Sequence, residues 1–168
     1  MIPVQRNFLE LKDLKNLKTN LINEKKYLIK KIKPDFKLNK FFYKQVGKNH
    51  RWIDRLSWSD KKWINYISNK NLETYIISEH NDLAGFFELL YNPELNETEI
   101  SYFGLLEEYI GKGIGGLALS VAIRKSFEKN IKRVWLHTCT LDHPNALKNY
   151  IARGMTVFKK ENINILDS

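Results

Sequence analysis

The sequence predicts an α+β fold in three layers, in which a mixed, mostly antiparallel central sheet is flanked by helices. Its 168 residues correspond to one domain at roughly 150 residues per domain. A content of 43% apolar and 28% charged residues is typical of globular proteins. After residue 72, strand patterns first form a hairpin and then alternate with helix patterns, which combines antiparallel and parallel pairing in one sheet.

Two strands and a helix are predicted before residue 35. Residues 8–11 and 27–32 are rich enough in apolar and aromatic side chains to form strands. Residues 14–21 place three leucines on one stripe at helical spacing, which predicts a helix. Pro34 ends this region.

Two further helices are predicted before the hairpin. Residues 41–46 favour a short helix that ends at Gly47, where the chain needs a left-handed residue. Ser59 is expected to cap the next helix, which carries Trp63, Tyr66 and Ile67 on one face.

The patterns after residue 72 are sharper. Residues 74–78 and 83–91 predict a hairpin around Asn81-Asp82, and residues 98–106 predict a third strand. Gly104 in this strand fits a bulge that would splay the strands.

The C-terminal half continues with two helices and two strands. A helix over 113–127 and a strand over 134–140 follow. Pro144 opens a last helix that runs to about Arg153 and stops at Gly154, and a strand over 155–160 ends the fold.

Composition excludes several classes of protein. The single cysteine, Cys139, excludes an internal disulfide framework and a Cys-rich zinc site, and we expect no metal. The longest stretch without charge, 113–123, is about half of the ~20 residues that span a bilayer, so no transmembrane segment is expected. The first residues show no secretory signal, which makes the cytoplasm the expected compartment.

The positive charge lies entirely in the N-terminal part. Residues 1–72 hold 18 Lys and Arg against 6 Asp and Glu, a net +12, whereas residues 73–168 carry a net −3. Such a field attracts polyanions, so a basic nucleic-acid-binding protein is one alternative. No helix-turn-helix, zinc-finger or RNP-type signature accompanies the lysines, and a solvated basic surface is the simpler interpretation.

A glycine-rich turn over 111–116, between a strand and a helix, is the strongest local signal. Unscreened amides at a helix start bind anions, which predicts a phosphorylated ligand. The turn fits the dinucleotide pattern G-x-G-x-x-G, but Lys132, Arg133 and Val134 stand where that site needs an acidic residue. The sequence has no nucleoside-triphosphate P-loop pattern.

Two motifs resemble the GNAT superfamily of acyl-CoA N-acyltransferases. Residues 110–115 match its Q/R-x-x-G-x-G/A turn, with Ile110 in place of the usual Gln or Arg. Residues 143–155 are similar to its N-x-x-A-x-x-x-Y-x-x-x-G-F helix, with His143 for Asn and Met155 for Phe. The motifs and the elements between them cover residues 97–160, and the hairpin from residue 73 agrees with the family's strand order.

The resemblance implies an enzyme that binds acetyl-CoA, or a related acyl-CoA, as co-substrate and acylates a primary amine by direct transfer. Glu99 lies where some members keep a catalytic base, and Tyr150 is implied as the general acid for the leaving thiolate. A strand amide near Gly104 or Leu105 would polarise the carbonyl. The implied cofactor-binding residues are Leu105, Leu106, Ile110, Gly111, Lys112, Gly113, Ile114, Gly115, His143 and Ala146. A catalytically silent acyl-CoA-binding or sensing module is the alternative.

Residues 137–143 allow two other interpretations. His137, Cys139, Asp142 and His143 could bind a metal or form a Cys-His nucleophilic pair. The simpler interpretation makes Cys139 a small core residue and lets His143-Pro144 begin the helix.

The region over 51–63 corresponds to the acceptor side of related enzymes. The +12 surplus in residues 1–72 disfavours polycationic acceptors, so an amine that also carries a carboxylate, or a peptide N-terminus, is expected. Only 13 residues follow Met155, so the acceptor side is either open or completed by a second subunit in a homodimer. The aromatic and charged residues concerned are Arg51, Trp52, Asp54, Arg55, Trp58 and Trp63.

Overall fold

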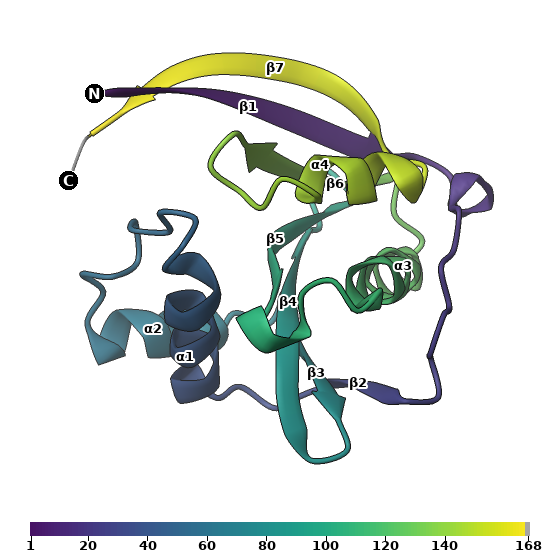
Figure 1. Ribbon diagram of the computed structural model, residues 1–168, viewed down its shortest axis with the longest axis horizontal. Coiled ribbons are helices and arrows are strands. Elements are labelled where there is room, and N and C mark those ends of the chain that lie inside the picture. Colours follow the sequence, from purple (N-terminus) through teal and green to yellow (C-terminus); the bar gives the residue numbers. More distant parts are fainter. Residues whose placement is uncertain (167–168) are drawn as a thin grey trace.

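The computed structural model describes residues 1–166 and confirms the α+β class. Within this range one seven-stranded sheet has the order β2-β3-β4-β5-β6-β1-β7, with α1 and α2 on one face and α3 and α4 on the other (Figure 1). Among the strands of residues 1–166, only β5 and β6 pair in parallel. The strands are β1 (Ile2–Leu11), β2 (Tyr27–Lys31), β3 (Leu72–Glu79), β4 (Asp82–Asn92), β5 (Glu97–Leu105), β6 (Arg133–Cys139) and β7 (Thr156–Ile165). The helices are α1 (Phe36–Gly47), α2 (Asp60–Ile67), α3 (Ile114–Phe127) and α4 (Ala146–Ala152).

The period-two alternation of the central strands builds a core on each face of the sheet. Ile77 and Phe87 belong to the larger core with α3, whereas their neighbours Ile76 and Phe86 pack with α1. Phe42 of α1 stacks on Phe86 with ring centroids 5.0 Å apart. Because these strands are apolar on both faces, helices are needed on both sides of the sheet.

The two N-terminal helices begin at side-chain caps. The carboxylate of Asp35 accepts from two amides of the first turn of α1, and Ser59 Oγ accepts from the Lys62 amide at 3.2 Å, as predicted. The left-handed conformation predicted for Gly47 is wrong, because this residue ends the helix without a positive φ. A side chain there would overlap Trp52, so close packing explains the glycine.

The first strand is longer than predicted and joins the far half of the sheet. β1 lies between β6 and β7, with Leu9 opposite Leu136 and Ile2 opposite Ile165. The start of β1 and the end of β7 therefore lie side by side (Figure 1). β7 extends beyond the predicted range because β1 offers it a partner along its whole length. The first 72 residues thus lie in two parts of the fold. β1 lies beside β6, whereas α1 and α2 lie by the other half of the sheet, which contains β3 and β4.

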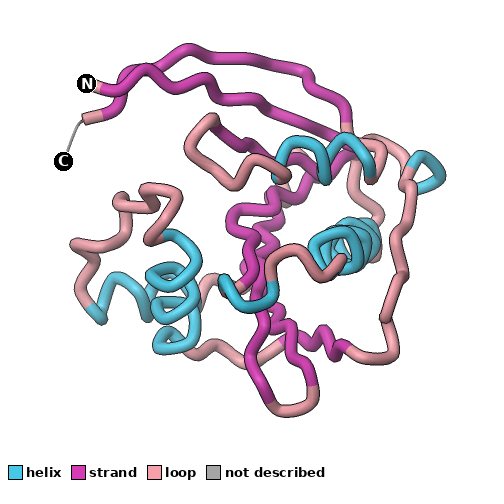
Figure 2. Tube along the Cα trace, in the orientation of Figure 1, coloured by secondary structure: helices cyan, strands magenta, loops and turns pink. Residues whose placement is uncertain are grey.

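The helix predicted over 14–21 is wrong. A short 3₁₀ turn, η1 (Leu14–Asn16), is followed by an extended loop that passes α3 before β2 (Figure 2). Leu17 and Leu21 pack against the core, and the Asn20 amide donates to Ser120 Oγ of α3 at 3.0 Å. The spacing of Leu17 and Leu21 reflects their contact with the core, and Ser120 and the Arg153 carbonyl accept backbone hydrogen bonds that a helix would have satisfied internally.

The hairpin is confirmed, with its turn one residue earlier at His80-Asn81. The bulge assigned to Gly104 lies elsewhere. The β4–β5 register shifts so that Ser101 is unpaired between Ile100 and Tyr102. Gly104 is regularly paired, and a side chain there would overlap Val46 of α1, so close helix packing requires this glycine.

The C-terminal elements follow the prediction closely. Gly113 caps α3 in a left-handed conformation with φ 81°, and Gly154 ends α4 with φ 101°. Helix α4 begins at Ala146, two residues after Pro144, which lies in the preceding turn. No helix in residues 1–166 is long and apolar enough to cross a membrane.

Candidate functional site

The sheet opens between β5 and β6. These two strands pair only from Glu97 opposite Arg133 to Glu99 opposite Trp135. Beyond Glu99, β5 continues to Leu105 and β6 to Cys139 without pairing with each other. Peptide groups on the facing edges are therefore available to a ligand.

A cavity of about 800 Å³ occupies this opening. Its lining comes from both faces, so it passes through the sheet from the α3 and α4 side to the α1 and α2 side. We call its two parts the glycine side and the aromatic side. The glycine side includes Gly111, Gly113, Gly115, Ala146, Asn149 and Tyr150, and the aromatic side includes Trp52, Arg55, Tyr66, Glu99 and Tyr102.

The turn before α3 is shaped to receive an anion. Gly111 and Gly113 have φ 82° and 81°, which are readily adopted only by glycine. Helix α3 has no side-chain cap, so the amides of its first turn keep their hydrogen-bonding capacity. A Cβ at either glycine would meet nothing within 4 Å, so the space before these amides is open. Such a helix start favours a phosphate group.

Two asparagines complete this side, and sequence reasoning missed both. Asn145 and Asn149 line the cavity next to Ala146, and Asn149 Nδ2 lies 3.4 Å from the position of a Cβ on Gly115. Their spacing of four residues places them on one helix face, which is the signal that could have found them.

Tyr150 reaches the opening from α4. Its side chain is 8% exposed, lines the cavity and meets Phe103 of β5 with ring centroids 6.4 Å apart. Its hydroxyl has no hydrogen-bond partner in the described residues. Burial raises the pKa of Tyr150, and the negative charge of Asp142 acts in the same direction. The hydroxyl is therefore protonated and available as a donor at neutral pH.

Glu99 is the half-buried carboxylate of the aromatic side. Neighbouring Glu97 is bound by Arg133 at 2.7 Å, whereas Glu99 has neither a hydrogen bond nor an ion pair within residues 1–166. Burial raises the pKa of Glu99 above its ordinary value. The charges of Glu88 and Glu97 act in the same direction, and Arg55 opposes them. An unpaired carboxylate facing a cavity is suited to a cationic group or to proton transfer.

The remaining predicted residues differ in their access to the cavity. Ile110 and His143 line it, whereas Leu106, Lys112 and Ile114 are not among its lining residues. The Ile114 side chain is buried in the core, so only its amide at the start of α3 remains a candidate contact. Lys112 Nζ lies over the ring of Tyr109, 5.2 Å from its centroid.

The backbone of β5 separates Leu105 from Leu106. The Leu106 amide donates to the Ala84 carbonyl at 2.8 Å, and its carbonyl accepts from Tyr109 at 2.9 Å. Leu106 is therefore already bonded within the chain. Because peptide groups alternate along a strand, the Leu105 amide points to the opposite side, toward the opening beside β6.

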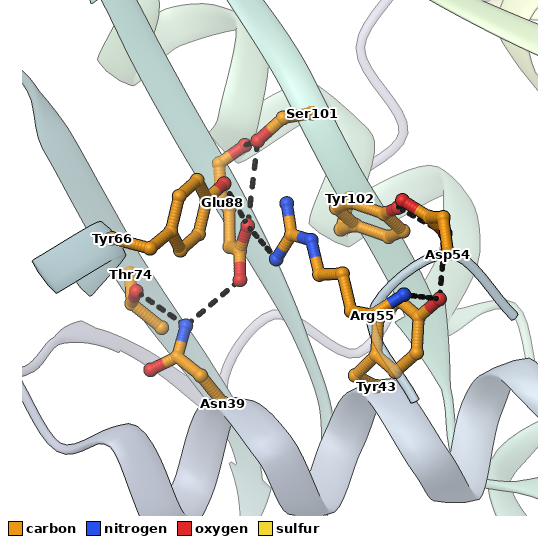
Figure 3. A network of polar contacts seen from close by, with 9 residues as sticks. All are labelled: Asn39, Tyr43, Asp54, Arg55, Tyr66, Thr74, Glu88, Ser101 and Tyr102. Atoms are coloured by element: carbon orange, nitrogen blue, oxygen red, sulfur yellow. Dashed lines mark hydrogen bonds and ion pairs between the residues drawn. The ribbon is translucent and has the colours of Figure 1, made fainter. Parts of the chain in front are cut away.

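A buried ion pair lies behind the aromatic side (Figure 3). Arg55 and Glu88 have side-chain exposures of 6% and 1%, and Nη1 lies 3.4 Å from Oε2. Glu88 also accepts from Tyr66 at 2.7 Å, Asn39 at 2.8 Å and Ser101 at 3.4 Å. These donors make Glu88 a fully bonded anion that fixes α1, α2 and β5 relative to one another.

Removing the charge of Glu88 should destabilise the protein. Glu88→Gln is expected to lower the free energy of unfolding by about 3 kcal/mol, because Arg55 would remain buried without a counter-charge. Urea denaturation measures this loss. Glu94→Gln, in an exposed turn, is the control and should change stability by less than about 0.5 kcal/mol. Equal stability of Glu88→Gln and the unmodified protein would contradict the structural role assigned to the pair.

The segment 137–143 is organised by Asp142. Its Oδ2 accepts from Thr138 Oγ1 at 2.5 Å and from the Cys139 amide at 2.9 Å. Burial raises the pKa of the Cys139 thiol, which keeps it protonated. Cys139 is half-buried and lines the cavity, so its assignment as a core residue is wrong. Residues 1–166 contain no group of three or more His, Cys, Asp or Glu side chains that could hold a metal ion.

A family model identifies the domain. The model described as the acetyltransferase (GNAT) family matches residues 36–155, which include α1, α2, the opening of the sheet and both sequence motifs. The chain belongs to the GNAT acetyltransferase family. This membership confirms the resemblance given by the glycine turn and α4, and it supports acyl transfer as the general chemistry of the chain. No curated protein matches this GNAT chain.

Solved structures share the fold of this GNAT chain at low sequence identity. An aminoglycoside acetyltransferase from an uncultured soil metagenomic sample, in complex with trehalose, has a TM-score of 0.67 and 12% identity, covering 86% of this chain and 97% of that one. A GCN5-related N-acetyltransferase from Kribbella flavida has a TM-score of 0.65 and 14% identity, covering 91% and 54%. A functionally unknown conserved protein from Staphylococcus epidermidis has a TM-score of 0.60 and 16% identity, and the match covers 95% of this chain and 59% of that one. This GNAT chain therefore spans little more than half the length of the last two.

Proposed function

We propose that this chain is an N-acetyltransferase that transfers an acetyl group from acetyl-CoA to a primary amine of a small molecule or peptide. Transfer is direct, within a ternary complex. One observation carries the proposal: a single cavity joins an uncapped glycine turn, Glu99 and Tyr150 through the opening between β5 and β6. The two catalytic groups thus share a space with an anion-binding turn.

Acetyl-CoA, when bound, supplies a thioester whose acetyl carbon forms the new C–N bond while its C–S bond breaks. The pyrophosphate is assigned to the amides of the turn, where open space and uncapped groups support it. The Leu105 amide, facing the opening, is assigned to the thioester carbonyl. Leu106 is not retained in the proposal, because its backbone groups are bonded within the chain. The other assigned contacts are Ile110, Gly111, Lys112, Gly113, Ile114, Gly115, His143 and Ala146, with Lys112 as a positive charge for the phosphates.

Proton transfers are assigned to Glu99 and Tyr150, two titratable groups that line the cavity and have no hydrogen-bond partner in the described structure. Glu99 accepts a proton from the incoming ammonium, directly or through water, so that nitrogen has a free electron pair. Tyr150 donates its hydroxyl proton to the departing thiolate sulfur. The groups belong to different elements, β5 and α4, which lets one act on the acceptor and the other on the leaving group.

Replacing the proposed base should alter the pH profile. In the unmodified enzyme, kcat/KM should fall as pH falls through the pKa of Glu99, which burial raises above 4.5. Glu99→Gln should lower kcat about 100-fold near neutral pH and remove this acidic limb. Glu97→Gln is the matched control on the same strand and should keep the limb. A pH profile of Glu99→Gln identical to that of the unmodified enzyme would exclude Glu99 as the base.

Isothermal titration with acetyl-CoA, with NADH as control, tests the function itself. Micromolar binding of acetyl-CoA alone is expected, followed by amine-dependent release of free CoA thiol in a screen of primary amines. Binding without release for any amine would favour a silent acyl-CoA-binding module. Absence of binding would overturn the enzyme proposal.

A further inference from the structure

Arg55 has far more hydrogen-bonding capacity than its neighbours use. A guanidinium carries five N–H donors, and within residues 1–166 those of Arg55 have two side-chain partners, Glu88 at 3.4 Å from Nη1 and the Tyr66 hydroxyl. Glu88 itself is already bonded by Tyr66, Asn39 and Ser101. A side chain that is only 6% exposed and keeps unused donors can bind a further acceptor.

Aromatic rings fix the direction of this guanidinium. Its Cζ lies 4.1 Å from the ring centroids of both Tyr66 and Tyr102, and 4.9 Å from that of Trp58. Tyr66 is held by its bond to Glu88, and Tyr102 is held by Asp54 at 3.2 Å. A clamped, planar donor fork is pre-organised, so binding a planar anion costs little conformational entropy.

The unused donors reach the cavity. Arg55 lines the cavity. In the described part of the chain, each of its side-chain nitrogens either has a hydrogen-bond partner or is not fully enclosed. In Figure 3 the second terminal nitrogen of Arg55 points away from the Glu88 carboxylate oxygens and carries no dashed line. A ligand in the cavity can therefore approach the side of the fork that Glu88 does not occupy.

The same side of the cavity holds a complementary carboxylate. Glu99 also lacks a partner in the described structure and lies within electrostatic range of Arg55. A plain amine would leave the Arg55 donors unsatisfied, and a plain acid would leave Glu99 unpaired. An amine that also carries a carboxylate satisfies both.

We propose that the acceptor is an amino acid or a related amine bearing a carboxylate, and that Arg55 binds the carboxylate while Glu99 faces the amine. Trp52 and Tyr102 supply an apolar wall for its body. The proposal rests on the proposed N-acetyltransferase function and names the acceptor class for the same site. It makes Arg55 a specificity-determining residue.

Matched pairs of acceptors test this inference in the full chain. Amino acids that differ in body and chain length, including L-phenylalanine, glycine and β-alanine, are compared with their amides by CoA-thiol release across several pH values. The acid should be preferred over its amide by about 10–100-fold in kcat/KM, as for a hydrogen-bonded charge pair. Arg55→Lys keeps the charge beside Glu88 but loses the fork, and the preference should fall below about 3-fold.

Two further variants separate specificity from folding and from long-range charge. The double variant Arg55→Met/Glu88→Leu removes both charges, which avoids a buried unpaired ion, and should also lose the preference for acids. Lys61→Met removes an exposed positive charge of α2 and should keep it. Acetyl-CoA affinity should stay unchanged in every variant. The inference would be overturned if the unmodified enzyme preferred amides or plain amines. It would also be overturned if the preference for acids survived in Arg55→Lys.

A binding experiment distinguishes failure of this inference from failure of the proposed function. Isothermal titration with 3-phenylpropionate and 3-phenylpropionamide needs no turnover. Tighter binding of the acid to the unmodified protein, lost in Arg55→Lys, supports Arg55 as a carboxylate site even without acetyl transfer. In a chain that acetylates amines, equal binding of the acid and the amide would reject the acceptor class and leave the transferase function intact.

Discussion

Gly113→Glu should weaken acetyl-CoA binding about 100-fold or more. Gly113 caps α3 with φ 81°, and a side chain there would enter the open space assigned to the pyrophosphate. A carboxylate a few ångströms from a phosphate is repelled by about 1 to 4 kcal/mol, and its bulk excludes the ligand from the uncapped amides. Isothermal titration of the purified variant with acetyl-CoA measures the loss.

Gly113→Ala is the matched control for this prediction. Like glutamate, alanine is strained by about 1–2 kcal/mol in the left-handed backbone conformation, but its side chain has no charge and is too short to enter the space assigned to the pyrophosphate. It should lower thermal stability as much as Gly113→Glu does, but retain acetyl-CoA affinity within about 10-fold. If Gly113→Glu bound acetyl-CoA normally, the pyrophosphate would have to lie elsewhere.

Tyr150→Phe should lower kcat about 100- to 1000-fold while the dissociation constant of acetyl-CoA changes less than about 3-fold. The phenylalanine keeps the contact with Phe103 but cannot protonate the leaving thiolate. Because the hydroxyl has no partner in residues 1–166, its removal leaves no buried group unsatisfied, and stability should hardly change. Steady-state kinetics, titration and thermal denaturation together measure the three quantities.

A second tyrosine serves as control for Tyr150→Phe. Tyr75 donates its hydroxyl to Glu73 at 3.0 Å and lies outside the cavity. Tyr75→Phe should leave kcat unchanged and lower stability slightly. An unchanged kcat in Tyr150→Phe would remove the general acid from the mechanism, and an equal loss in both variants would indicate a general structural effect.

Local chemistry made the C-terminal half of the fold predictable. Gly154 ends α4 as predicted, and Gly113, where the predicted helix begins, caps α3 in a left-handed conformation. The apolar hairpin strands needed cover on both faces whatever lay around them. In the N-terminal third, the leucines of 14–21 also had helical spacing, but Leu14 is exposed, and Leu17 and Leu21 are placed by packing against the large core, which a local pattern does not reveal.

The candidate site was predictable only in part. Glycine spacing placed Gly111 and Gly113 at an anion-binding turn because backbone conformation there depends on the residues themselves. The roles of Leu105 and Leu106 depended instead on which side of β5 each amide faces, and pairing with β4 decided this. The sequence placed Arg55 near the acceptor side, but its open donor fork appears only when Tyr66, Tyr102 and Glu88 converge from separate elements.

The sequence by itself determined the α+β class, the strand and helix types after residue 72 and the glycine turn, since each depends on residues close together in the chain. The tertiary structure alone decided that β1 enters between β6 and β7, that β5 and β6 separate after Glu99, and that Arg55 and Glu99 face one cavity. These features depend on pairing and packing between segments far apart in the sequence. The free energy that stabilises these features comes from burial and hydrogen bonds between different elements, and a local sequence pattern does not reveal such contacts.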